Sequence, residues 1–143
     1  MVQQWVHGDN GVDLVAMVVG DDPRLRRMAI FDAIVNNTDR KGGHVVPMPD
    51  GHLFGVDHGV TFSVVPKLRT VLWGWMGQAF LDDELAGLER VRAALRGDLG
   101  AGLRELLDAA EVTATKRRVA SLLRTRRFPR PSRNWPAVPW PAF

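Results

Sequence analysis

Two aspartates in this chain stand in contexts where carboxylates commonly act on phosphate groups. Asp39 lies in a polar run, residues 36–44, that follows the most apolar segment of the sequence, and Asp57 opens the triplet Asp57-His58-Gly59. Transfer of a phosphoryl group needs two carboxylates, because one orients or deprotonates the attacking hydroxyl and another holds Mg²⁺ against the phosphates. The pair is therefore a candidate for phosphoryl-transfer chemistry.

The elements around the two aspartates are expected to bring them together. The apolar run over residues 25–35 follows an Asp-Asp-Pro helix start and predicts a buried helix that ends at the polar run. Residues 45–46 and 53–56 flank a Pro-Asp-Gly turn and predict a small β-hairpin. Because a hairpin returns the chain to the place it left, Asp57 is expected close to Asp39, as in the carboxyl-terminal lobes of kinases.

The remaining sequence is mostly helical in its pattern. Residues 13–19 predict a short apolar helix, whereas residues 60–80 indicate no regular element. Three helices are expected after Asp82, the last from about Thr113, because leucine and valine recur at helical spacing. We therefore expect an α+β, mostly α fold over residues 1–128, followed by a tail rich in proline and tryptophan at residues 129–143. The tail aromatics could lie on the body or face a partner.

The composition excludes several classes of chemistry. The chain has 143 residues, is 45% apolar and contains no cysteine. It therefore suits one core and excludes disulfides, thiolate metal sites and a cysteine nucleophile. The apolar stretches are well short of the roughly 20 residues that span a bilayer, and the first residues lack the pattern of a signal peptide. We expect a cytoplasmic protein without a transmembrane segment.

The net charge of +3 is divided unevenly along the chain. Residues 1–112 hold 11 Lys and Arg against 16 Asp and Glu, whereas residues 113–143 hold 8 Lys and Arg and no acid. A basic stretch of this kind is typical of a solvated helix face and of the arginine bias of a GC-rich genome. The alternative is an anionic partner, such as nucleic acid or an anionic membrane.

Two stretches of the sequence resemble a known kinase superfamily. Residues 30–40, followed by residues 55–62, are similar to the catalytic loop and metal-binding loop of the phosphatidylinositol 3-/4-kinase-like superfamily, a layout shared with Golgi secretory-pathway and HipA-type kinases. Four motifs more closely resemble an actinobacterial family related to phosphatidylinositol kinases: Asn-Asn-Thr-Asp-Arg-Lys-Gly-Gly-His, Val-Asp-His-Gly-Val-Thr-Phe, Lys-Leu-Arg-Thr-Val-Leu-Trp-Gly-Trp and Trp-Pro-x-x-Pro-Trp-Pro. The closer resemblance covers nearly the whole chain.

This resemblance implies an ATP- and Mg²⁺-dependent phosphotransferase. The fold implied is a protein-kinase-like carboxyl-terminal lobe, with the hairpin after the catalytic loop and a helical bundle at the end. Asp39 would be the catalytic aspartate and Asp57 the metal ligand, with Arg40 and Lys41 as candidates for phosphate or loop electrostatics. Residues 1–6 would be the hinge strand that contacts adenine, with Gln4 and Trp5 as the nucleotide-binding residues. The phosphate acceptor is left open.

The sequence departs from the superfamily pattern in three ways. His44 stands where an asparagine usually binds metal, and an imidazole is a poor ligand for Mg²⁺, which prefers oxygen. Lys41 replaces the histidine that usually follows Asp-Arg. The chain also begins where an amino-terminal lobe should end, so we expect a truncated kinase. The alternative is an inactive remnant, or pseudokinase, that binds partners through its basic carboxyl-terminal region.

Two further readings concern acids and histidines near this region. Asp32, the acid inside the apolar helix, is interpreted as an anchor for Arg40 or a backbone amide. Four residues in and after the predicted hairpin region have side chains that can bind metal ions: His44, His52, Asp57 and His58. A zinc or manganese hydrolase is therefore a minor alternative.

Overall fold

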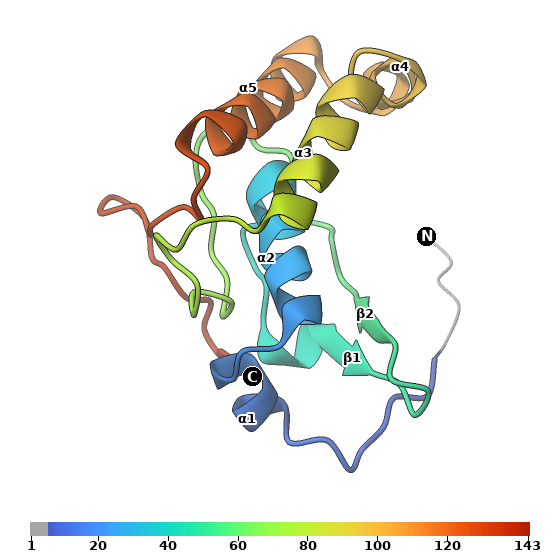
Figure 1. The fold of residues 1–143 in the computed structure, drawn as a ribbon, viewed down its shortest axis with the longest axis vertical. Helices are drawn as coiled ribbons and strands as arrows, with labels where there is room; N and C mark the ends of the chain where they lie inside the picture. Colours follow the sequence, from blue (N-terminus) through green and yellow to red (C-terminus); the bar gives the residue numbers. More distant parts are fainter. Residues whose placement is uncertain (1–5) are drawn as a thin grey trace.

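The computed structural model describes residues 6–143, which form five α-helices and a two-stranded antiparallel sheet (Figure 1). The helices are α1 (Leu14–Val19), α2 (Pro23–Val35), α3 (Asp82–Ala94), α4 (Asp98–Leu106) and α5 (Ala109–Thr125). A short 3-10 helix, η1 (Gly42–His44), leads into strands β1 (Val45–Pro47) and β2 (Leu53–Gly55). This confirms the predicted α+β, mostly helical class.

In this part of the chain no helix is long and apolar enough to cross a membrane. The expected nucleotide-binding residues Gln4 and Trp5 lie outside the described residues.

Helix α2 begins and ends as its sequence predicts. The Asp22 side chain accepts a hydrogen bond from the Arg24 backbone N at 2.8 Å, and Pro23 occupies the first turn, where a missing amide hydrogen costs little. Asn36 ends the helix in the left-handed conformation, with φ 55°. Because Asp32 is fully buried within α2, the helix carries a carboxylate into the protein interior.

The hairpin returns the chain to the end of the polar loop, as predicted. Strands β1 and β2 pair with Val45 opposite Gly55, and Gly51 turns the chain with φ 83°. Only glycine adopts this conformation readily. After β2, the Val56 amide donates to His44 O at 2.9 Å. The segment that carries Asp57 is therefore bonded to the residue that precedes β1.

Residues 56–81 contain no helix or strand, yet they are bonded to the end of α2 and to the polar loop. The Phe62 amide donates to Val35 O at 2.6 Å, and the Val71 amide donates to Arg40 O at 3.0 Å. The Arg69 amide donates to Asn37 O at 2.9 Å. The polar loop is thus held from two directions, by the hairpin and by this irregular segment.

Helices α3 and α5 pack together on α2 and complete the core. Leu88 on α3 and Val119 on α5 are almost completely buried, and Phe128 packs edge-to-face on Phe80 with ring centroids 4.7 Å apart. Helix α5 begins at Ala109, earlier than the predicted start near Thr113. The cause is a capping box, in which the Asp108 amide donates to the Glu111 side chain at 3.0 Å.

The proline-rich tail lies on the body and reaches the polar loop. Ala137 O accepts hydrogen bonds from the Thr70 amide at 3.0 Å and from Trp73 Nε1 at 2.8 Å. Near the end of the chain, Ala142 O accepts from the Gly42 amide at 2.7 Å. Trp140, by contrast, is 90% exposed. The sequence left two positions open for the tail aromatics, on the body or facing outward, and Trp140 takes the outward one.

Candidate active site

The polar loop after α2 is held by its own side chains. Asn36 donates from Nδ2 to Ser63 O at 2.9 Å, and Asn37 donates from Nδ2 to Asp32 Oδ1 at 3.0 Å. The Asn37 Oδ1 in turn accepts from the Asp39 amide at 3.0 Å. Both asparagines are buried, so these bonds satisfy groups that water does not reach. The result is a fixed backbone at Asp39.

The carboxylate of Asp39 lies between two cations. Its Oδ1 accepts a hydrogen bond from Arg69 Nη2 at 3.2 Å, and its Oδ2 is 3.3 Å from Lys41 Nζ. Arg69 also donates from Nε to Thr38 O at 2.9 Å, which fixes the guanidinium beside the loop. The Asp39 side chain is 24% exposed and therefore reachable from solvent. A carboxylate in this position can accept the proton of a hydroxyl, with positive charge at hand for a phosphate.

Arg40 is the centre of the loop's hydrogen-bond network. Its side chain and that of Asp32 are both fully buried, and Arg40 donates from Nε to Asp32 Oδ2 at 3.0 Å and from Nη2 to Asp32 Oδ1 at 2.9 Å. Nη1 donates to Val56 O at 2.9 Å and to His44 O at 3.3 Å. Nη2 is also 2.7 Å from His58 Nε2. The predicted anchoring of Arg40 by Asp32 is confirmed.

This one guanidinium fixes both of the segments that carry the candidate aspartates. Asp39 directly precedes Arg40, and Asp57 lies between Val56 and His58, which both contact the Arg40 side chain. Arg40 was expected to act on phosphate or on loop electrostatics. Its complete burial makes it a positioning residue, whereas Asp39 and Lys41 remain accessible at the surface.

Asp57 has a left-handed backbone conformation. Its φ is 54°, in a region that aspartate tolerates better than most L-residues. The side chain is 64% exposed, and its Oδ2 is 3.4 Å from His44 Nε2. The other ring nitrogen of His44, Nδ1, is buried without a hydrogen-bond partner. In this turn the Asp57 carboxylate faces solvent beside an imidazole.

The structure does not bring the four residues of the alternative zinc or manganese site together. His52 packs on Phe54 with ring centroids 4.3 Å apart, and His58 is engaged by Arg40. Within residues 6–143, no three His, Cys, Asp or Glu side chains form a group that could hold a metal ion. Of the four residues, His44 and Asp57 are the pair in contact.

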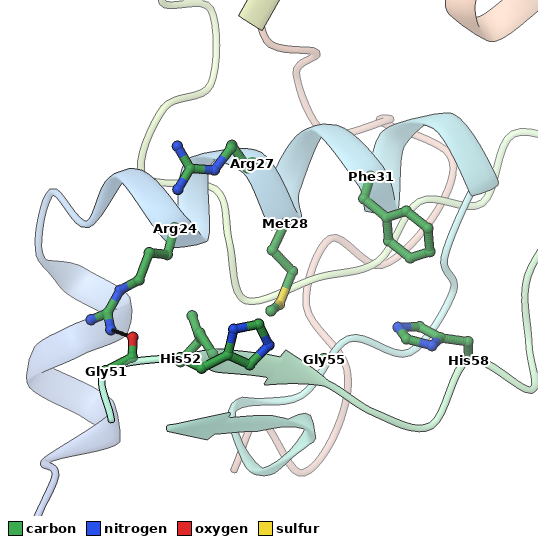
Figure 2. Close-up of a pocket in the computed structure, with 9 residues that line it drawn as sticks. Arg24, Arg27, Met28, Phe31, Gly51, His52, Gly55 and His58 are labelled. Carbon is green, nitrogen blue, oxygen red and sulfur yellow. Dashed lines mark hydrogen bonds between the residues drawn. The ribbon is translucent and has the colours of Figure 1, made fainter. Parts of the chain in front are cut away.

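A hollow of about 400 Å³ lies between α2 and the hairpin, beside the Asp57 segment (Figure 2). Met28 and Phe31 of α2 face the hairpin across it, and the imidazole of His58 lies at one end. The rings of Phe31 and His58 make an edge-to-face contact with centroids 5.2 Å apart. A Cβ added at Gly55 would be 3.2 Å from Met28 Cε, so the tightest neighbour of this glycine is the side chain that faces the hairpin from α2.

His58 takes part in this contact in its neutral form. A guanidinium has only donors, so His58 Nε2 must accept the hydrogen bond from Arg40. Partial burial, followed by the positive charge of Arg40, lowers the pKa of His58 from its ordinary value of 6.5. Protonation removes the acceptor and places a second positive charge beside Arg40.

We expect the stability of the protein to fall in mild acid through His58. Because the pKa of His58 is lower in the folded chain than in the unfolded chain, the unfolded state takes up a proton first as the pH falls below 6.5. The loss continues until the pH has passed the folded pKa. Urea unfolding at about pH 7.5 and about pH 5 should show a smaller difference in His58→Gln than in the wild type, because glutamine still accepts from Arg40. His52→Gln on the hairpin is the matched control, and an equal pH dependence in all three proteins would contradict the prediction.

Comparison with known proteins finds one relative along most of the chain. The chain is 47% identical over 135 residues to Protein Rv2133c of Mycobacterium tuberculosis. The match covers 94% of this chain and 48% of the relative, so the chain spans about half the length of the relative it matches. No family model matches the chain, and no solved structure matches it. The relative's name states no activity, so the function proposed below is inferred from the residues of this chain.

Two contacts at the site were missed by sequence reasoning. Arg69, to which the sequence assigned no role at this site, contacts both Asp39 and the Thr38 carbonyl. His58 was considered only as a metal ligand, yet it accepts from Arg40. Arg69 follows Asp39 by 30 residues through an irregular segment, so no periodic pattern signals the pairing.

Proposed function

We propose that the chain is an ATP- and Mg²⁺-dependent phosphotransferase domain that resembles the carboxyl-terminal lobe of phosphatidylinositol 3-/4-kinase-like enzymes. The observation that carries the proposal is the buried Arg40, whose side chain joins the loop of Asp39 to both neighbours of Asp57. Phosphoryl transfer depends on positioning two carboxylates on separate segments, and this network supplies a rigid means of doing so.

In this proposal Asp39 acts as the base for the acceptor hydroxyl. Its carboxylate is partly exposed and is oriented by Arg69 and Lys41. Lys41 carries its ammonium on a flexible stem and pairs with Asp39, whereas Arg69 is also tied to the Thr38 carbonyl. Lys41 is therefore suited to turn toward a transferring phosphate while Arg69 keeps the base in place.

The residues present fit a single Mg²⁺ that is shared with a nucleotide. Mg²⁺ is usually held by one or two carboxylates together with substrate phosphates and water, and the exposed carboxylate of Asp57 suits this role. When bound, the ion would neutralise charge on the phosphates. His44 lies against Asp57 and is better suited to orient that carboxylate than to bind Mg²⁺ itself.

The nucleotide is proposed to bind beside the hairpin. Gln4 and Trp5, which the superfamily resemblance assigns to the hinge, lie outside the described residues. Asp9, which follows them, donates its amide to Pro47 O at the end of β1 at 2.7 Å. Adenine is therefore proposed to bind near β1, which would leave the phosphates to Asp57.

Calorimetric titration with ATP in the presence of Mg²⁺ tests the proposal. Wild-type chain should bind ATP, and Asp57→Asn should lower the affinity by roughly tenfold or more, because a neutral amide is a weak ligand for Mg²⁺. Asp50→Asn, at the far end of the same hairpin, is the matched control and should bind as the wild type does. Equal affinity with Mg²⁺ and with EDTA, or an unchanged affinity in Asp57→Asn, would contradict the proposal.

A second candidate is a binding module without phosphotransferase activity, favoured by the exposed cations of α5. Arg117 and Arg124 on this helix are exposed. This candidate predicts that binding of anions is independent of Mg²⁺ and of Asp57.

A further inference from the structure

A second hollow, of about 330 Å³, lies between α3 and α5, away from the candidate active site. Figure 1 shows these two helices beside each other at the end of the molecule opposite the hairpin. The floor of the hollow contains Leu95 and Val119, which are 2% and 0% exposed. A floor that is part of the packed core keeps the walls at a fixed separation.

The walls of this hollow carry four cations and no acidic side chain. The cations are Arg92 in the last turn of α3, Arg96 just after that helix, and Lys116 and Arg117 on α5. Arg92 forms an ion pair with Glu89 on its own helix. Within the described part of the chain, the other three have no carboxylate within 4 Å. Three uncompensated positive charges therefore border one small space.

The neighbouring Arg118 shows how the same stretch of sequence divides into two roles. Arg118 donates from Nε to Ile34 O at 2.7 Å, from Nη1 to Ser63 O at 3.1 Å and from Nη2 to Thr115 Oγ1 at 2.7 Å. Burial lowers the pKa of Arg118, as expected for a cation whose contacts are neutral oxygens. Arg118 thus fastens α5 to the end of α2, whereas Arg117 is exposed and lines the hollow.

We infer that the hollow between α3 and α5 binds a compact polyphosphate anion. Like charges that share a small space repel one another, and an anion of matching charge removes that cost. Arg92 and Arg96, at and just beyond the end of α3, line the same hollow as Lys116 and Arg117 of α5. The volume is at the lower end for small-molecule sites, which favours a compact ligand with several charges over a nucleic-acid strand or a membrane surface. This inference does not depend on the proposed phosphotransferase activity.

Calorimetry with sodium tripolyphosphate in buffer that contains EDTA tests the inference. EDTA removes Mg²⁺, so the candidate site at Asp57 does not contribute. The wild-type chain should bind tripolyphosphate at low ionic strength, and added salt should weaken the binding. The double variant Arg96→Gln with Arg117→Gln should bind roughly tenfold or more weakly, because two charge-assisted contacts are lost.

The matched control removes two exposed cations that lie outside the hollow, one on α3 and one on α4. Arg90→Gln with Arg104→Gln has the same net charge as the test variant and should keep wild-type affinity. The inference is overturned if the two double variants weaken binding equally, since the effect would then reflect net charge alone. Failure of the wild type to bind, or tighter binding of a single-stranded oligonucleotide or of phosphatidylserine vesicles than of tripolyphosphate, would also overturn it.

Discussion

Replacement of Asp32 by alanine is expected to lower the free energy of unfolding by roughly 3–5 kcal/mol. The change leaves the fully buried guanidinium of Arg40 without its carboxylate, and also removes the acceptor of the Asn37 side chain. An unpaired charge in the interior keeps its desolvation cost and loses the attraction that offset it. Urea unfolding monitored by tryptophan fluorescence measures the effect.

Two comparisons separate this explanation from simple loss of a side chain. Asp22→Ala removes a helix-capping carboxylate from the start of α2 and should cost only about 1 kcal/mol. The double variant Asp32→Leu with Arg40→Met removes both charges and should be less destabilised than the sum of the two single variants. If Asp32→Ala is no more harmful than Asp22→Ala, the buried ion pair does not have the role assigned to it.

Conversion of Asp39 to asparagine is expected to slow phosphoryl transfer by roughly 100- to 10,000-fold, the usual contribution of a general base. Asparagine keeps the shape of the side chain and can still accept from Arg69, but it cannot take a proton from the acceptor hydroxyl. Because Asp39 is partly exposed, the stability of the fold should change little. Release of labelled phosphate from ATP in the presence of Mg²⁺ measures the rate.

The interpretation of this result depends on nucleotide binding, which should survive in Asp39→Asn. The carboxylate proposed to hold the metal belongs to Asp57. A lower transfer rate with an unchanged affinity for ATP would therefore identify Asp39 as a base and not as a metal ligand. Asp50→Asn should leave both quantities unchanged. A transfer rate in Asp39→Asn equal to that of the wild type would exclude Asp39 as the base.

Local patterns in the sequence predicted much of the scaffold around these residues. The limits of α2 follow from Asp22, Pro23 and the asparagines after Val35, and the hairpin follows from a Pro-Asp-Gly turn between short apolar runs. The anchoring of Arg40 by Asp32 was also predictable, because the two residues lie eight positions apart across a helix end. Each of these features depends on interactions between residues that are near in the chain.

Contacts between distant segments could not be predicted in the same way. The pairing of Arg69 with Asp39 and the bond from Gly42 to Ala142 join residues through irregular backbone, which leaves no periodicity to detect. The start of α5 was predicted too late, near Thr113, for a different reason. The helix is capped at Asp108, which lies before the apolar residues whose spacing predicted it.

The sequence by itself determined the two aspartates, the helix and the hairpin that position them, and the excess of cations after residue 112. Only the tertiary structure decided which cations serve the fold and which remain available. Arg40 and Arg118 are buried and bonded to interior oxygens, whereas Arg96 and Arg117 line an open hollow. The sign of a side chain's charge is a property of the residue itself. Its burial and its hydrogen-bond partners are set only when α2, α3 and α5 pack together.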